Sequence, residues 1–115
     1  MPRGKEVSGL PYMTRIYING QVLLPAMLVR ALGIEWARYA DIVIRHNGRL
    51  IRLRGGVQLL RARRAASRQF TIPSEVRAKF GGVMPLDRVE IIDVRPLRAS
   101  DVKGGPVIVH ESDEH

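Results

Sequence analysis

Cysteine is absent from this chain of 115 residues, and aromatic side chains make up only 5% of it. The absence of cysteine excludes disulfide bonds, thiolate metal sites and cysteine nucleophiles together. With so few aromatic rings, the core must be built mainly from valine, isoleucine and leucine, which favours β-strands. Apolar residues make up 45% of the chain, which is enough for one compact domain of this length.

No apolar run approaches the roughly twenty residues of a membrane span, and the first residues lack the apolar segment of a signal peptide. We therefore expect a cytoplasmic protein without a membrane partner. Residues 1–12 are predicted to be an N-terminal tail, and residues 98–115 an acidic C-terminal tail. Between them, residues 13–97 are predicted to form a single domain.

Acidic residues are scarce in the middle of the chain. Nineteen lysines and arginines against eleven acidic residues give a net charge of +8, and the sequence pI is about 11.0. No acidic residue occurs between Asp41 and Glu75, whereas eight arginines do: Arg45, Arg49, Arg52, Arg54, Arg61, Arg63, Arg64 and Arg68. The guanidinium group suits bidentate contacts with phosphate, so this window predicts a polyanion-binding surface. A merely solvated arginine face is the alternative.

A pattern of glutamine, apolar residue, any residue, apolar residue and proline occurs twice, at 21–25 and, 48 residues later, at 69–73. The correspondence continues at the same offset, matching Leu28 with Val76, Leu32 with Phe80 and Gly33 with Gly81. With a gap of one residue, the apolar segment 42–44 then matches 89–91. Each copy predicts a strand, a short helix opened by proline and ended by glycine, a loop and another strand.

The predicted strands are 14–19, 21–24, 42–45, 50–53, 57–61, 69–72 and 89–94. Asn19-Gly20 and Asn47-Gly48 lie between neighbouring strands and are typical of tight hairpin turns. The helices are too short to be stable alone and must pack against a sheet. We therefore predict a mostly β fold, a small closed β-barrel of two ββα(β) repeats, 14–54 and 57–97, with two short helices and pseudo-twofold symmetry.

The segment from Gln69 to Gly81, followed by 86–91, resembles the AbrB/SpoVT-type swapped-hairpin DNA-binding family. The shared pattern is a strand, Thr-Ile-Pro, a short helix with glutamate and arginine, glycine, and aspartate before the next strand. Residues 19–53 resemble a more diverged copy. In that family a homodimer interleaves two hairpins into one barrel and binds DNA through arginines, so the resemblance implies a monomeric pseudo-dimer, with further self-association open. RIFT-type barrels show similar repeats, and the sequence does not separate the two connectivities.

The arginine-rich window and the resemblance together predict a DNA-binding transcriptional regulator or nucleoid-associated factor. Seven arginines are predicted to contact duplex DNA phosphates: Arg15, Arg30, Arg61, Arg63, Arg64, Arg68 and Arg77. Three alternatives stay open. They are an RNA- or ribosome-associated barrel, an antitoxin-like interaction module that uses the acidic tail, and a RIFT-barrel ligand-binding protein.

Other polar residues receive simpler interpretations. His46 precedes Asn47-Gly48 and is predicted to be a turn residue. Trp36 and Tyr39 are predicted to cap one end of the barrel rather than to stack on bases. The histidines and acidic residues of the C-terminal tail predict at most an adventitious metal site. No nucleophile with a matching base and acid is visible, so we expect no enzymatic activity, no cofactor and no metal.

Overall fold

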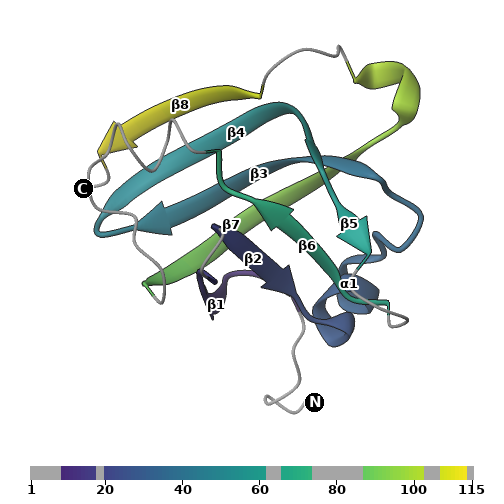
Figure 1. The fold of residues 1–115 in the computed structure, drawn as a ribbon, viewed down its shortest axis with the longest axis horizontal. Coiled ribbons are helices and arrows are strands. Elements are labelled where there is room, and N and C mark those ends of the chain that lie inside the picture. The colour runs from purple at the N-terminus through teal and green to yellow at the C-terminus, as the bar shows by residue number, and fades with distance from the viewer. Residues whose placement is uncertain (1–8, 18–19, 62–65, 74–86, 103–106, 114–115) are drawn as a thin grey trace.

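The computed structural model describes residues 9–17, 20–61, 66–73, 87–102 and 107–113 (Figure 1). Its elements are β1 (Tyr12–Arg15), β2 (Gln21–Leu24), α1 (Ala26–Leu32), β3 (Tyr39–His46), β4 (Arg49–Gln58), β5 (Leu60–Arg61), β6 (Arg68–Thr71), β7 (Arg88–Leu97), the 3₁₀ helix η1 (Ala99–Asp101) and β8 (Ile108–Asp113). The prediction of a mostly β fold is confirmed. The second predicted helix lies outside the described residues.

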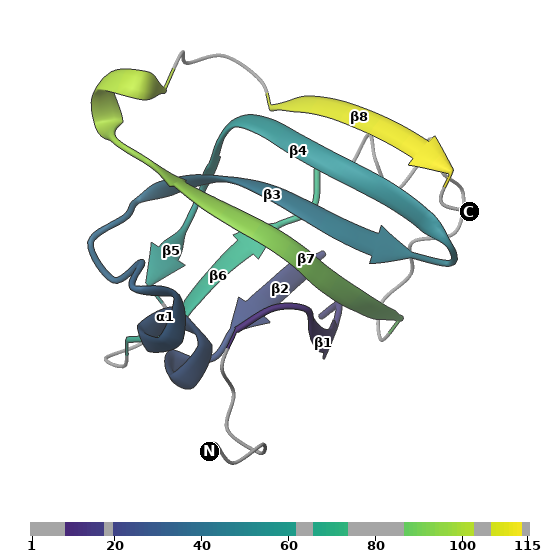
Figure 2. The same ribbon diagram turned by 180° about the vertical axis from the view of Figure 1, so that it is seen from behind.

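The strands form two antiparallel sheets. One sheet has the order β1-β7-β3-β4-β8, and the other has the order β2-β6-β5. The smaller sheet packs against one face of the larger one, since β2 and β6 lie in front of β7 in Figure 1 and behind it in Figure 2. The sheets are linked in two places: Ile16 forms an isolated bridge with Val22, and Leu59 alone separates β4 from β5.

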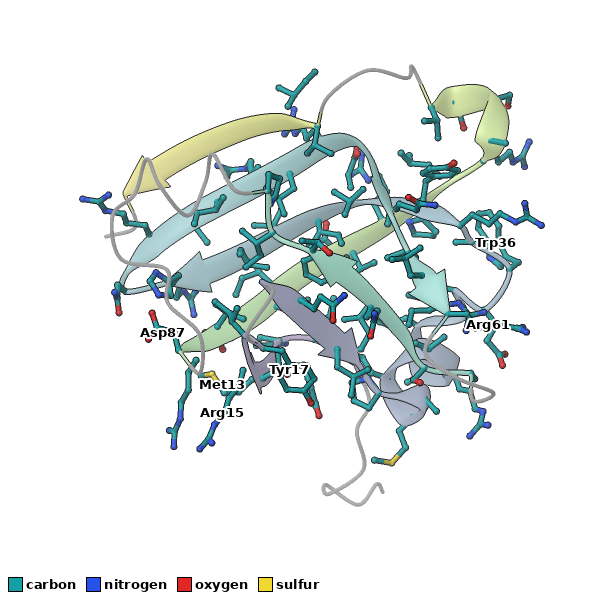
Figure 3. The ribbon with its side chains drawn as sticks, in the orientation of Figure 1. Met13, Arg15, Tyr17, Trp36, Arg61 and Asp87 are labelled. Carbon is teal, nitrogen blue, oxygen red and sulfur yellow. The ribbon has the colours of Figure 1, made fainter. Side chains whose placement is uncertain are left out.

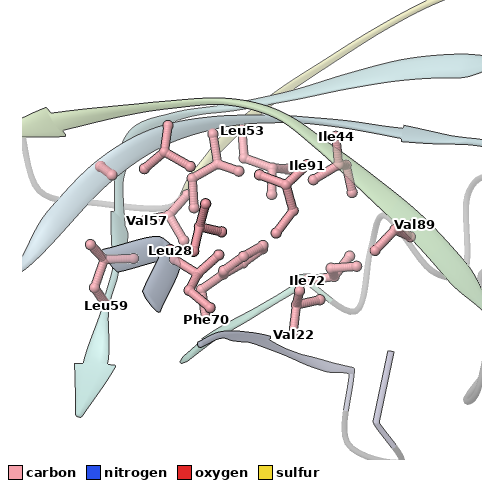
Figure 4. Close-up of a cluster of buried hydrophobic side chains, with 14 of the residues drawn as sticks. Val22, Leu28, Ile44, Leu53, Val57, Leu59, Phe70, Ile72, Val89 and Ile91 are labelled. Atoms are coloured by element: carbon pink, nitrogen blue, oxygen red, sulfur yellow. The ribbon is translucent and has the colours of Figure 1, made fainter. Parts of the chain in front are cut away.

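The hydrophobic core fills the space between the sheets (Figure 4). Alternate residues of β3 point inward, so Ala40, Ile42 and Ile44 are buried while their neighbours are half-buried. Phe70 on β6 is the largest of the fully buried side chains. Burying each large apolar side chain contributes about 1.5–3 kcal/mol, so an aliphatic core with few aromatic rings is sufficient to hold the sheets together.

Helix α1 lies between Pro25 and Gly33, the proline and glycine from which the first short helix was predicted. Pro25 has an extended backbone and occupies the N-cap position, one residue earlier than the first helical position expected for it. Leu28 and Val29 are buried, which packs the helix onto the core. Gly33 ends the helix with φ 66° and ψ 32°, the left-handed conformation that glycine adopts without a steric penalty.

The two predicted hairpins differ in outcome. Strands β3 and β4 pair across Asn47-Gly48, whose φ angles of 51° and 78° are both positive, as this tight turn requires, so this hairpin is confirmed. In the first hairpin, the described residues are joined by the bridge between Ile16 and Val22 and by hydrogen bonds from the Tyr17 amide to the Gln21 carbonyl oxygen and from the Gly20 amide to the Tyr17 carbonyl oxygen. Strand β1 itself pairs with β7, which is distant in sequence.

The C-terminal residues are not the tail that the sequence suggested. Pro96 and Leu97 continue β7, η1 follows, and β8 pairs with β4 from Arg49↔Asp113 to Arg54↔Ile108. Strand pairing satisfies backbone donors and acceptors along the edge of β4, which gives this polar segment a place in the sheet despite its composition. The acidic residues of 111–113 therefore belong to a strand.

Two ladders each contain a pair of residues that the sequence repeat matches. Val22 pairs with Phe70 in β2 and β6, and these positions are 48 residues apart, the offset of the repeat. Ile44 pairs with Ile91 in β3 and β7, which the repeat also matches once its one-residue gap is counted. In each of these two ladders, one pair of corresponding residues therefore lies directly opposite.

Candidate nucleic-acid interface

The seven arginines predicted to contact phosphate do not form one surface. Arg15, Arg30 and Arg61 are exposed, on β1, α1 and β5. Figure 3 shows Arg15 and Arg61 at opposite ends of the molecule. Arg63, Arg64 and Arg77 lie outside the described residues. Arg61 and Arg68 are cross-strand neighbours, but only Arg61 is exposed.

Arg68 is buried, with a relative exposure of 6%. One of its guanidinium nitrogens, Nη2, donates to the Glu35 carbonyl oxygen at 2.8 Å, and Nη1 donates to the carbonyl oxygens of Ala66 and Ser67. The guanidinium donors of Arg68 are thus occupied by backbone carbonyl groups, so the prediction that Arg68 contacts phosphate is wrong. The burial follows from its place at the start of β6, beneath the connection between α1 and β3.

Arginines and acidic residues lie side by side on β3 and β7. Arg45 forms an ion pair with Glu90, its cross-strand neighbour on β7. Asp41 on β3 is opposite Arg95 on β7, and its carboxylate accepts a hydrogen bond from the Gly55 amide. The outer face of the larger sheet therefore mixes both signs of charge, which is typical of a solvated face.

Arg15 and Arg88 form a different arrangement. They are directly opposite each other in the β1–β7 ladder, and both side chains are exposed. Opposed residues of an antiparallel pair have their Cβ atoms about 4.5–5.5 Å apart, so two guanidinium groups share a small area. Neither is paired with a carboxylate among the described residues. We call Arg15 and Arg88 the arginine pair.

A cleft of about 540 Å³ lies at the other end of the molecule. It lies between the α1–β3 connection and the segment that leads from β4 into β5. Its lining residues are Glu35, Trp36, Ala37, Arg38, Tyr39, Gln58, Leu59, Leu60, Arg61 and Arg68. We call this the Trp36 cleft. Its volume falls within the usual range for small-molecule sites, about 300–1,000 Å³.

The floor of the Trp36 cleft is fixed by buried groups. Ala37 and Leu59 are 3% and 6% exposed, and the Leu59 amide donates to the Arg38 carbonyl oxygen at 2.8 Å. The guanidinium of Arg68 holds the carbonyl of Glu35. These contacts place the α1–β3 connection against β4 and β5 and define the shape of the cleft.

Trp36 is 58% exposed, so its prediction as a cap for the end of the barrel is wrong. Its neighbour Ala37 takes the inward position, and the tryptophan ring is left at the surface of the cleft. Tyr39 is half-buried at the start of β3. Figure 3 shows Trp36 and Arg61 at the same end of the molecule.

The Trp36 cleft carries more positive than negative charge. Its charged lining residues are three arginines and Glu35. Arg38 and Arg61 are exposed, and neither is paired with a carboxylate in the part of the chain that the structure describes. The cleft thus presents two available guanidinium groups beside an aromatic ring.

His46 is not simply a turn residue. It is the last residue of β3, is 6% exposed, and its Nε2 lies 3.0 Å from Asp87 Oδ2. Since the carboxylate can only accept in this bond, Nε2 carries the proton. The pair joins the end of β3 to the residue before β7. Its two residues are 41 positions apart, so no local sequence pattern predicts this contact.

The described residues contain no group of three or more histidine, aspartate or glutamate side chains that could hold a metal ion. They also contain no helix long and apolar enough to cross a membrane. The expectations of no enzyme, no cofactor and no metal stay predictions.

Sequence reasoning missed Arg38, Arg88 and the cleft. Arg88 lies beside Arg15 only because β1 pairs with β7. Arg38 becomes part of a cleft only because β4 and β5 approach the α1–β3 connection. One signal was available, since Arg38 stands two positions after the lone tryptophan.

Comparisons of the chain with protein-family models, with curated proteins and with solved structures give no match. The function is therefore inferred from the residues and their geometry alone.

Proposed function

We propose that this chain is a nucleic-acid-binding protein that holds the phosphate backbone with exposed arginines. Its role would be that of a DNA-binding regulator or nucleoid-associated factor of AbrB-like type. The observation that carries the proposal is the arginine pair, Arg15 and Arg88, opposed on adjacent strands and exposed together.

Like charges opposed across a ladder destabilise a sheet by about 0.2–1 kcal/mol. A bound phosphate removes this penalty because each guanidinium can donate to its oxygens. Positions that break a local rule of stability are those where a functional role is expected. The arginine pair is therefore suited to bind an anion when the protein performs its function.

The architecture supports the same proposal. Strands β2 and β6 pair around repeat-matched residues, and so do β3 and β7. The bridge at Ile16 and the single residue between β4 and β5 link the two sheets in two places. We infer one closed barrel of two repeats with pseudo-twofold symmetry, the architecture that the family resemblance implies.

The test compares two double variants with equal loss of charge. Arg15→Ala with Arg88→Ala removes the arginine pair. Arg54→Ala with Arg95→Ala removes two exposed arginines from the mixed-charge face, where Arg95 opposes Asp41. Binding is measured by fluorescence anisotropy with labelled duplex DNA of about 15 base pairs, longer than the 40 Å axis of the protein at roughly 3.4 Å per base pair.

We expect the first variant to bind at least tenfold more weakly than the parent, equivalent to about 1.4 kcal/mol. Its free energy of unfolding should be unchanged or raised, because the repulsion between the two guanidinium groups is gone. The second variant should bind nearly as the parent does. Equal losses in the two variants would reject the arginine pair as a specific phosphate site, and no binding by the parent at low salt would reject the function.

A further inference from the structure

We propose that the Trp36 cleft binds an unpaired base of single-stranded nucleic acid, with the base stacked on Trp36 and the flanking phosphates held by Arg38 and Arg61. This inference rests on the proposed function and specifies the form of nucleic acid that this part of the surface takes. It differs from the duplex binding that the sequence suggested.

The exposure of Trp36 is the first support. A tryptophan side chain usually buries a large apolar area, about 150–250 Å², so leaving it 58% exposed gives up favourable burial. The chain has only one tryptophan, and it is placed in the cleft. An indole face open to solvent can instead be covered by a flat partner.

The position of Trp36 is fixed on both sides although its side chain is exposed. On one side, Arg68 donates to the Glu35 carbonyl oxygen at 2.8 Å. On the other side, the buried Ala37 donates its amide to the Ile34 carbonyl oxygen at 3.0 Å. A backbone held in this way presents the ring with little loss of conformational freedom on binding.

The charges around the ring identify the partner as a polyanion. Arg38 is two residues from Trp36 in the same wall, and Arg61 stands in the opposite wall on β5. Both are exposed and without a carboxylate partner among the described residues. Alternating phosphates and bases match arginines that flank an aromatic ring, the arrangement by which single strands are bound.

An unpaired base fits this arrangement and a paired base does not. In a duplex, each base is covered on both faces by its neighbours, so no face is available for an indole ring. In a single strand the base can turn outward and stack on an aromatic side chain. DNA and RNA single strands share this chemistry, and the experiment distinguishes them.

The lone tryptophan makes the test direct, because intrinsic tryptophan fluorescence of the full chain reports on Trp36 alone. The probes are oligothymidylate and oligouridylate of about 15 nucleotides, and an abasic strand with the same number of phosphates. We expect the first two to change the emission of Trp36 and the abasic strand to bind without this change. Since stacking contributes about 1–3 kcal/mol per base, the abasic strand should bind about 5- to 150-fold more weakly.

Two variants distinguish a loss of base stacking from a loss of folded structure. Their binding is measured by the fluorescence anisotropy of labelled strands. Trp36→Phe retains an aromatic ring and should retain most of the affinity. Trp36→Leu retains apolar bulk without a ring and should reduce affinity for oligothymidylate to that for the abasic strand. Circular dichroism of both variants should match the parent, because the side chain is largely exposed.

If all strands bind with equal affinity and Trp36 emission does not change, the base site is rejected while the proposed phosphate binding stands. If duplex DNA binds and single strands do not, the base site is likewise rejected. If no probe binds at low salt, both proposals fail.

Discussion

The buried guanidinium of Arg68 ties the start of β6 to the connection between α1 and β3. It donates to three carbonyl oxygens, of Glu35, Ala66 and Ser67. Arg61, its cross-strand neighbour, is exposed. Of these two arginines opposed in one ladder, Arg68 therefore stabilises the fold, whereas Arg61 is exposed at the surface of the cleft.

We expect Arg68→Met to lower the free energy of unfolding by about 2–3 kcal/mol, because it removes the charged donor of three partly buried hydrogen bonds. Arg61→Met is the matched control and should change stability by no more than about 0.5 kcal/mol. Urea denaturation of both variants measures the difference. Equal, small effects would show that the Arg68 hydrogen bonds do not stabilise the fold.

At the scale of elements, Gly55 and Gly56 bend β4 where its register with β3 shifts. Their φ angles are 97° and 103°, values that residues with a side chain rarely adopt. A Cβ atom on Gly56 would lie 2.9 Å from Cγ1 of Val102. The bend thus needs glycine for its backbone conformation and for the close approach of Val102.

Gly56→Ala should therefore reduce the free energy of unfolding by about 1–3 kcal/mol. The loss should be smaller when the same change is made in a Val102→Ala background, because the close contact is relieved while the backbone strain stays. Thermal denaturation of the four proteins checks both expectations. An unchanged stability of the single variant would contradict the strain inferred for this bend.

The second prediction at the scale of elements concerns strand β8. Its ladder with β4 covers the edge of that strand. A chain that lacks residues 107–115 should melt several degrees lower than the parent, since about 1 kcal/mol corresponds to roughly 4–8 °C in a small domain. If these residues were only a solvated tail, differential scanning calorimetry would find the same melting temperature for both chains.

At the scale of the whole molecule, the local signals predicted local structure. Asn47-Gly48 predicted the β3–β4 hairpin, and Gly33 predicted the end of α1. Both features depend on neighbouring residues, so a sequence is sufficient to predict them. The offset of 48 residues matched β2 with β6 as equivalent segments but did not predict that they pair.

Long-range pairing explains what the sequence did not predict. The partners β1 and β7, and β4 and β8, are far apart in the chain, so no pattern within one segment indicates them. The arginine pair and the Trp36 cleft both result from such approaches. The burial of Arg68 also depends on a carbonyl 33 residues away. Composition predicted a basic surface, but only tertiary structure separates functional arginines from structural ones.

The two candidate surfaces lie at opposite ends of a molecule whose longest dimension is 40 Å. Binding to a polyanion is the claim on which both depend. The most direct measurement is the affinity of the unmodified chain for duplex and single-stranded DNA as salt is raised from about 50 to 200 mM. If the arginine pair neutralises about two phosphates, the affinity for the duplex should fall at least roughly tenfold over this range. Affinity that stays constant across the range, or no binding at the lowest salt, would contradict the assignment of the exposed arginines to phosphate binding.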